Sequence, residues 1–313
     1  MCFAPAMHCQ TLYRSSELSV TAIKCRPQNL GRGGLEAQAF HSLAFVRRGA
    51  YRYHRGREDI IIDPLTAMFW ARDDAYSVSH PFGCGDDCLE FRFSEEALRE
   101  ARPALRRTRM RNELFTTTRT APISADICLA LRLLAKRLEC GLAARLEVEE
   151  IALNILGAAG RAENTANGGV ESPPARTQAR SKRKVEQAKE LMLSDLGRNW
   201  SLHEVAAAVG ASPFHLTRLV RTNTGSALHR YLTHQRLAAS LQCLLDGAGS
   251  ITKVALDGGF SSHSHFSAAF KKEYGVTPNA VRRSYGQVTG RQNADTEAAV
   301  RGRYVNRRAL RRS

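Results

Sequence analysis

Residues 251–278 read ITKVALDGGFSSHSHFSAAFKKEYGVTP, and residues 202–225 read LHEVAAAVGASPFHLTRLVRTNTG. In each stretch a short amphipathic segment ends at a glycine, Gly259 or Gly210, and a second segment starts just after a serine suited to cap a helix. A short helix, a tight glycine turn and a second helix form the helix-turn-helix pattern. We therefore predict two such motifs in the C-terminal part of the chain.

Equivalent positions of the two motifs repeat at a nearly constant spacing. Ile251 follows Leu202 by 49 residues, and Gly275 follows Gly225 by 50. Between the motifs, residues 227–245 carry leucines at helical spacing, which predicts one long helix. A rigid helix there would hold two recognition helices about 34 Å apart, which is one turn of DNA.

The charge of the chain favours a polyanionic partner for this C-terminal part. The 313 residues contain 46 Lys and Arg against 30 Asp and Glu, a net charge of +16. Residues 181–313 carry +12 of this excess and residues 1–180 only +4. A basic domain with helix-turn-helix patterning points to double-stranded DNA as the partner.

The N-terminal half changes from strand-like to helical patterning. Short apolar or aromatic runs bounded by turn residues predict strands at 42–54, 58–64, 67–71, 76–80 and 88–93, which suggest a small barrel. Apolar stripes at helical spacing then predict helices over 124–140 and 144–157. These helices either complete the core of the barrel domain or form a dimer seam. The fold class expected is α+β with two domains.

Composition divides the chain into five parts. Residues 161–184 contain almost nothing apolar, and residues 287–313 hold seven arginines among few apolar residues. The expected parts are an irregular lead-in (1–34), a sensing and dimerisation domain (35–160), a flexible linker (161–184), a double helix-turn-helix domain (185–286) and a basic disordered tail (287–313).

The second helix of each motif carries the candidate DNA contacts. In the first motif, an arginine can bridge guanine O6 and N7, a phenylalanine can meet a thymine methyl group, and neighbours can bind base edges or phosphate; these residues are Phe214, His215, Thr217, Arg218 and Arg221. In the second motif, the first turn would face the groove and the lysines would hold phosphates; these residues are Ser262, His263, Ser264, His265, Lys271 and Lys272. The alternative is an ordinary solvated helix face, with His265 packed locally.

Residues 185–284 resemble the AraC/XylS family of bacterial transcription regulators. The matching residues include Gly210-x-Ser-Pro-x-x-Leu216-x-Arg218-Leu and Gly259-Phe-Ser-Ser-x-Ser-His-Phe266-x-x-x-Phe270-Lys-x-x-Tyr-Gly275-Val-Thr-Pro. The resemblance implies an activator that contacts RNA polymerase, responds to a small-molecule effector and can form a homodimer. The family often has glutamine where this chain has His263 and a basic residue where it has Ala268, so the second helix would read fewer base edges.

The N-terminal half resembles the cupin-like sensing domain of that family, through Phe40-His-Ser-Leu, Val46-Arg-Arg-Gly and Val78-Ser-His-Pro. Side chains in its strands that would line an effector pocket are Tyr51, Tyr53, Trp70, His80 and Phe91. Aromatic residues in short strands also form plain core. His80, Cys84 and Cys88 lie at a metal-ligand spacing, but no second His or Cys pair is near in sequence, so we expect no metal and no cofactor.

Several classes of protein are not expected. No apolar run reaches the roughly 18–20 residues of a membrane helix, and the N-terminus lacks the layout of a secretory signal, so a cytoplasmic location with reduced cysteines is expected. The sequence contains no GxSxG, GxGxxG after a strand, Walker A or HExxH motif, and we expect no enzyme. The alternative that stays open is a chemical-sensing or methyl-accepting regulator in which thiol chemistry at Cys84 and Cys88 is primary.

Overall fold

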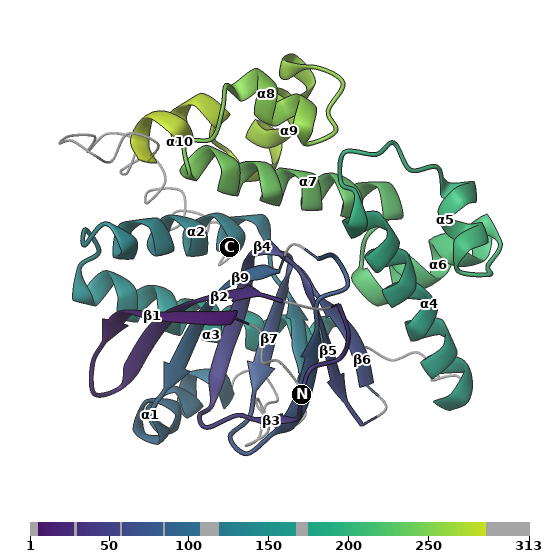
Figure 1. Cartoon of the computed structure of the whole chain (residues 1–313). Helices are drawn as coiled ribbons and strands as arrows, with labels where there is room; N and C mark the ends of the chain where they lie inside the picture. Colours follow the sequence, from purple (N-terminus) through teal and green to yellow (C-terminus); the bar gives the residue numbers. More distant parts are fainter. Residues whose placement is uncertain are drawn as a thin grey trace.

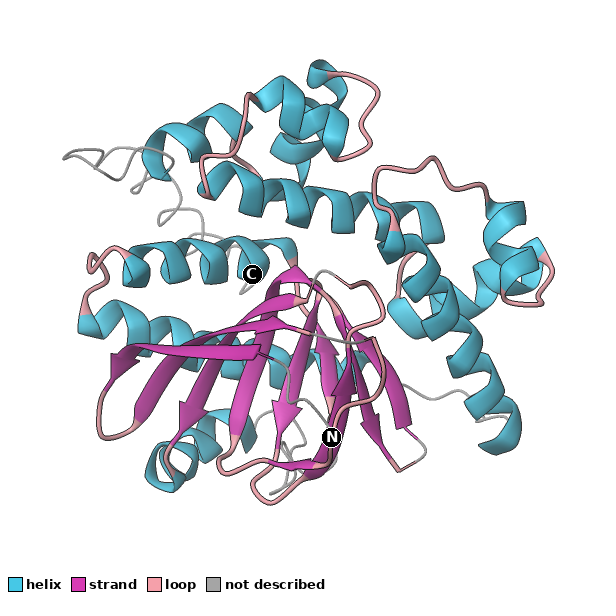
Figure 2. Cartoon of the chain, in the orientation of Figure 1, coloured by secondary structure: helices cyan, strands magenta, loops and turns pink. Residues whose placement is uncertain are grey.

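The structure is a computed structural model of the chain. It describes residues 6–27, 30–56, 58–83, 85–106, 119–166 and 175–285. A sheet-rich N-terminal domain lies beside a helical C-terminal domain (Figures 1 and 2). The expected basic tail, residues 287–313, falls outside the described residues.

The N-terminal domain contains two antiparallel sheets. The larger has the strand order β1-β2-β9-β4-β7-β10 and the smaller β3-β8-β5-β6. The strands are β1 (Ala6–Arg14), β2 (Leu18–Arg26), β3 (Glu36–Ala37), β4 (Ser42–Gly49), β5 (Tyr51–Arg55), β6 (Glu58–Ile62), β7 (Thr66–Trp70), β8 (Ala75–Ser79), β9 (Asp86–Phe93) and β10 (Thr120–Pro122). No ladder joins the two sheets within the described residues, so the expected cupin-like barrel is not closed. Instead, the β1–β2 hairpin extends the larger sheet beyond β9.

Alternating side chains of the larger sheet fill two separate cores. On β9, Cys88 faces the smaller sheet and packs with Tyr53 and Trp70. The next residues on the opposite face, Leu89 and Phe91, pack beneath helices. This period-two alternation is what a sheet covered on both faces requires.

Three helices accompany the larger sheet: α1 (Glu95–Arg106), α2 (Ala125–Glu139) and α3 (Arg145–Ala166). Leu131 and Leu134 of α2 are buried in the same core as Phe91, together with Val148 and Ile155 of α3. Of the two roles predicted for residues 124–157, these buried contacts show completion of the core.

The C-terminal domain consists of seven helices in the described residues. They are α4 (Ala175–Ser194), α5 (Leu202–Ala208), α6 (Pro213–Thr224), α7 (Leu228–Leu245), α8 (Ile251–Asp257), α9 (His263–Tyr274) and α10 (Pro278–Tyr285). The long helix expected at 227–245 is α7. Within the described ranges, no helix combines the length and apolar character needed to cross a membrane.

Two expected segments differ from the structure. Residues 1–34 were expected to be irregular, yet they contain β1 and β2, because inward-facing Leu18, Val20 and Ala22 are buried where β2 pairs with β9. Residues 161–184 were expected to be a flexible linker. However, α3 continues to Ala166 and α4 begins at Ala175, while residues 167–174 lie outside the described part.

Buried charges join the two domains where α4 meets the edge strand β6. The Ile61 N–H donates to Glu186 at 2.7 Å, and the Lys189 ammonium donates to the Ile61 carbonyl at 3.0 Å. These side chains satisfy backbone groups that an edge strand leaves unpaired. Asp63 lies 3.3 Å from Lys189 and accepts a 2.8 Å hydrogen bond from the Tyr231 hydroxyl of α7.

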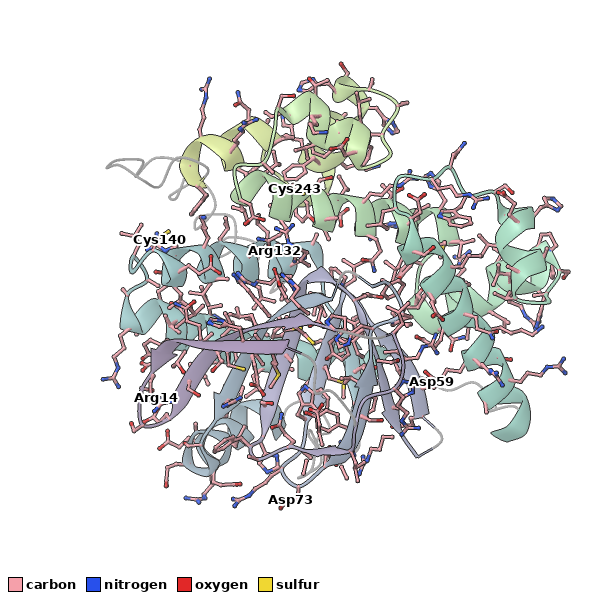
Figure 3. All side chains as sticks on the ribbon, in the orientation of Figure 1. Arg14, Asp59, Asp73, Arg132, Cys140 and Cys243 are labelled. Carbon is pink, nitrogen blue, oxygen red and sulfur yellow. The ribbon has the colours of Figure 1, made fainter. Side chains whose placement is uncertain are left out.

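Helix α2 makes a second junction between the domains. Its Leu129 and Leu133 face away from the sheet and are buried with Leu241 of α7 and Phe266 of α9. Figure 3 labels Arg132 on α2 and Cys243 on α7, the two helices that meet at this junction. The C-terminal domain is therefore held against the N-terminal domain through α4 and α7 at one junction and through α7 and α9 at the other.

Candidate nucleic-acid interface

Local sequence sets both ends of α6. The Ser212 hydroxyl accepts a 3.2 Å hydrogen bond from the His215 N–H, and proline occupies the first turn. Gly225 ends the helix with φ +69°, a left-handed conformation that glycine adopts without strain. Leu216 and Val220 bury one face of the helix, so its opposite face is turned to solvent.

The exposed face of α6 carries the residues predicted to contact DNA. Phe214 is 81% exposed, and Arg218 and Arg221 are also exposed. Neither guanidinium has an ion-pair or hydrogen-bond partner among the described residues. His215 and Thr217 are half-buried, and the Thr217 hydroxyl donates to the Pro213 carbonyl at 2.9 Å. An exposed aromatic ring beside two free arginines is suited to a polyanion.

Helix α9 repeats this arrangement. The Ser262 hydroxyl accepts from the His265 N–H at 3.1 Å, and Gly275 ends the helix at φ +73°. All six predicted contacts on this helix are exposed: Ser262, His263, Ser264, His265, Lys271 and Lys272. The local packing considered for His265 is present, since its Nδ1 lies 3.1 Å from the Ser261 hydroxyl and its ring packs edge-on against Phe260.

Arg236 of α7 links the two helix pairs, a role that sequence reasoning missed. Its guanidinium donates to the carbonyls of Leu196 at 2.7 Å and Arg198 at 2.8 Å, both before α5, and of Gly259 at 3.1 Å in the α8–α9 turn. Burial lowers the pKa of Arg236, and Asp195 opposes that shift. A Cβ on Gly259 would lie 2.9 Å from the Arg236 Cζ, so glycine makes this contact possible.

Helix α7 separates the two candidate surfaces. Its 18 residues span about 27 Å at 1.5 Å per residue. In Figure 1 it runs from the α5–α6 pair to the α8–α9 pair. The length of α7 is close to the roughly 34 Å repeat of the major groove along one face of DNA.

The five side chains predicted to line an effector pocket are not brought together. Tyr51, Tyr53 and Trp70 are buried in the core between the sheets, whereas Phe91 is in the core under α2 and α3. His80 instead donates from its Nε2 to the Asp86 Oδ1 at 2.7 Å. Burial lowers its pKa, but hydrogen bonds with Asp86 and Cys25 outweigh burial and raise the pKa of His80 to about 9.

A cavity of about 250 Å³ lies instead between the domains. Arg47 and Arg48 of β4 line one side, and Gln242 and Cys243 of α7 line another. The Gln242 Oε1 is buried and has no hydrogen-bond partner within the described part of the chain. Both arginines are already ion-paired, Arg47 with Glu139 and Arg48 with Asp87 and Asp246, so the unused acceptor of Gln242 is the group that the cavity offers to a small molecule.

Comparison with known proteins defines the class of this chain. Residues 205–284 match the helix-turn-helix domain family. A segment of 88 residues is 34% identical to the HTH-type transcriptional regulator MtrA of Neisseria gonorrhoeae and covers 28% of this chain and 29% of that protein. A segment of 84 residues is 40% identical to the right origin-binding protein of Escherichia coli and covers 27% of this chain and 29% of that protein. Residues 205–284 of the chain are therefore similar to a helix-turn-helix domain.

Among helix-turn-helix proteins, the matched region resembles one family in particular. The matched C-terminal region resembles that of AraC/XylS transcription regulators, as its sequence predicted. The match spans less than a third of the length of these relatives. Among solved structures, ToxT from Vibrio cholerae is 13% identical over 88% of this chain and 100% of its own, with a TM-score of 0.35.

Proposed function

We propose that this chain is a sequence-specific transcription regulator whose helices α6 and α9 enter adjacent segments of the DNA major groove. The observation that carries the proposal is the repeated exposed face on two identically capped helices, held apart by α7. The match of residues 205–284 to a DNA-binding family supports it.

Helix α6 would make the specific contacts. Arg218 would donate two hydrogen bonds to a guanine, and Phe214 would contact a thymine methyl group. His215 and Thr217 would bind neighbouring base edges, and Arg221 a phosphate. The exposure of Phe214 and of both arginines supports these roles.

Helix α9 would contribute fewer base contacts. His263, Ser264 and His265 would reach into the groove, and Ser262, at the positive end of the helix dipole, would bind phosphate together with Lys271 and Lys272. The contact of His265 with Ser261 leaves only its second ring nitrogen for DNA. Most of the affinity of α9 would therefore come from phosphate.

The effector would bind in the cavity between the domains and not among the aromatic residues of the sheets. A ligand there would touch β4 and α7 together. The ligand would shift the equilibrium between two arrangements of the domains only if it bound one of them better than the other. From the family resemblance, we propose an activator that contacts RNA polymerase and forms a homodimer.

Thiol chemistry as the primary activity is less well supported. Burial raises the pKa of the Cys88 thiol well above its usual range, and Asp86 raises it further, so the nucleophilic thiolate is disfavoured. Cys84 lies outside the described residues.

Selection of genomic DNA fragments with the purified full-length chain tests the proposal. We expect enrichment of a few upstream regions that share an asymmetric site with two elements about one helical turn apart. Arg218→Ala should reduce this enrichment, whereas the charge-matched Arg145→Ala, on α3 of the other domain, should not. Binding without enrichment would contradict sequence-specific recognition.

A further inference from the structure

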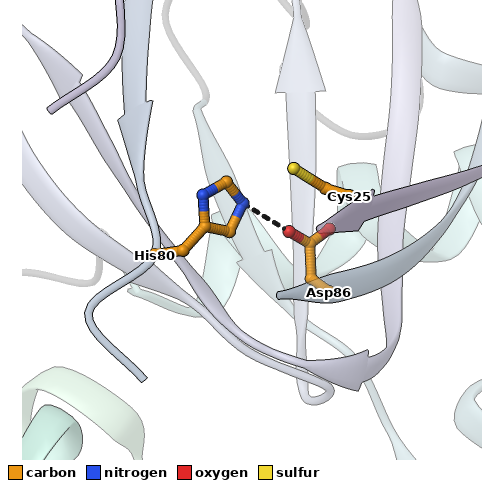
Figure 4. Close-up of side chains that lie close together, drawn as sticks. All are labelled: Cys25, His80 and Asp86. Atoms are coloured by element: carbon orange, nitrogen blue, oxygen red, sulfur yellow. Dashed lines mark hydrogen bonds and ion pairs between the residues drawn. The ribbon is translucent and has the colours of Figure 1, made fainter. Parts of the chain in front are cut away.

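Three metal-ligating side chains converge inside the N-terminal domain. Cys25 comes from β2, His80 follows β8 of the smaller sheet, and Asp86 begins β9 (Figure 4). Their ligand atoms all lie within 4.8 Å of one another. The three residues belong to strands of both sheets, so the fold and not local sequence brings them together.

A second cysteine meets the same carboxylate. The Cys88 Sγ donates to the Asp86 Oδ2 at 3.0 Å, while the His80 Nε2 contacts the Oδ1 at 2.7 Å. All four side chains are at most 6% exposed. A buried His–Asp ion pair accounts for two of these groups, but it does not account for two buried thiols, one beside the His80 imidazole and one beside the Asp86 carboxylate.

The backbone at Gly85, beside the cluster, lies very close to β2. The turn between His80 and Asp86 approaches β2 so closely that a Cβ on Gly85 would lie 2.0 Å from the Cys25 carbonyl oxygen. Gly85 also has φ +70°, which favours glycine. Since only glycine fits there, the turn can bring His80 and Asp86 together above Cys25.

We propose that Cys25, His80, Asp86 and Cys88 bind one divalent metal ion of the zinc class. Sulfur, imidazole nitrogen and carboxylate oxygen are the ligands that zinc takes in a closed tetrahedral site. Ligands at about 2.0–2.3 Å from zinc lie roughly 3.3–3.8 Å apart, so Cys25, His80 and Asp86 need to contract by up to about 1 Å. Cys88 touches this group only at Asp86, so its thiol has to move further to become the fourth ligand. The site is separate from the proposed DNA contacts and does not rest on them.

Charge and proton balance are consistent with this ligand set. Binding requires both thiols as thiolates and the imidazole without its extra proton, so the departing protons leave to solvent. Two thiolates and one carboxylate around a divalent ion leave the site with one negative charge.

Metal analysis of the purified full-length chain tests the proposal. Protein produced with added zinc and dialysed against metal-free buffer is expected to retain one zinc ion per chain. Cobalt(II) in its place is expected to give a thiolate-to-cobalt charge-transfer band and the visible bands of tetrahedral cobalt. Absence of bound zinc, or of the thiolate band, would overturn the proposal.

Single substitutions separate this site from adventitious thiol binding. Cys25→Ser, Cys88→Ser and His80→Gln should each weaken zinc binding by more than about 100-fold, beyond the 10–100-fold effect of residues that only support a ligand. Cys140→Ser removes an exposed thiol and should leave zinc binding unchanged. Equal loss in Cys140→Ser, or no loss in His80→Gln, would refute the assignment. Circular dichroism of the metal-free forms shows whether each variant is folded.

Discussion

The domain junction at Asp63 allows a quantitative test. The Asp63 side chain is fully buried, lies 3.3 Å from the Lys189 ammonium and accepts from Tyr231 at 2.8 Å. Asp63→Asn keeps the size of the side chain and one acceptor oxygen but removes the charge that Lys189 faces. The substitution therefore tests the buried ion pair and not the packing.

The expected loss of stability depends on the interactions that Lys189 keeps in the Asp63→Asn variant. Removing one partner of a buried ion pair costs about 3–5 kcal/mol. Lys189 keeps Glu186 at 3.4 Å and the Ile61 carbonyl at 3.0 Å. We therefore expect a loss of about 3 kcal/mol in the free energy of unfolding. For a domain of about 150–250 residues, this corresponds to a Tm lower by roughly 6–12 °C.

Scanning calorimetry at neutral pH measures this loss directly. The matched control is Asp59→Asn, which removes a half-exposed carboxylate from an ion pair with Arg52 and should cost at most about 1 kcal/mol. If Asp63→Asn lowered Tm no more than Asp59→Asn, the buried pair would contribute nothing and the reasoning would be refuted.

The same pair predicts how stability depends on pH. Burial raises the pKa of Asp63, but Lys189 and three hydrogen bonds together outweigh burial and leave that pKa below its usual value. The pKa of this carboxyl group is therefore lower in the folded state than in the unfolded state, where it is about 3.9. The ionised carboxylate stabilises the fold at every pH above about 3.9, and this stabilisation is lost as the pH falls through the folded-state pKa. The Tm difference between wild type and Asp63→Asn should therefore shrink in acid. A constant difference down to the lowest pH at which the protein folds would contradict the depressed pKa.

Three further predictions concern the C-terminal domain. Arg218→Ala should cost about 1–3 kcal/mol on a specific DNA site and relax preference at one base pair, measured by anisotropy on single-base variants. Lys271→Ala should weaken binding to all sequences alike and reduce the slope of log affinity against log salt by about 0.9. Gly259→Ala should destabilise the domain by about 1–3 kcal/mol in urea, through its left-handed φ and its contact with Arg236. The loss should exceed that of Gly225→Ala, which has a similar φ but no atom within 4 Å of a Cβ.

Local signals in the sequence were sufficient for the helix pairs. Ser212 and Ser262 cap their helices, and Gly225 and Gly275 end them, as predicted. Such caps depend on the residue itself and on backbone groups within a few positions, so no distant part of the chain is needed to define them. The exposure of the predicted DNA-contacting face follows from the same helical period.

Long-range pairing decided what the sequence alone left open. The lead-in was expected to be irregular, but β2 pairs with β1 on one side and, on the other, with β9, about seventy residues away, which the sequence did not indicate. That register places Cys25 opposite Asp86, which the spacing of His80, Cys84 and Cys88 could not indicate. The separation of Phe91 from the other aromatic residues likewise required knowing which face of β9 meets the second sheet.

The sequence by itself therefore determined the two helix pairs, their caps and the exposed face that we propose for DNA contact, because these depend on contacts within a few residues. Only the tertiary structure decided the two-sheet arrangement, the buried Asp63–Lys189 pair and the cluster at Asp86. Each of these features depends on residues far apart in the chain, and the spacing of residues along the sequence does not show which strands pair with one another.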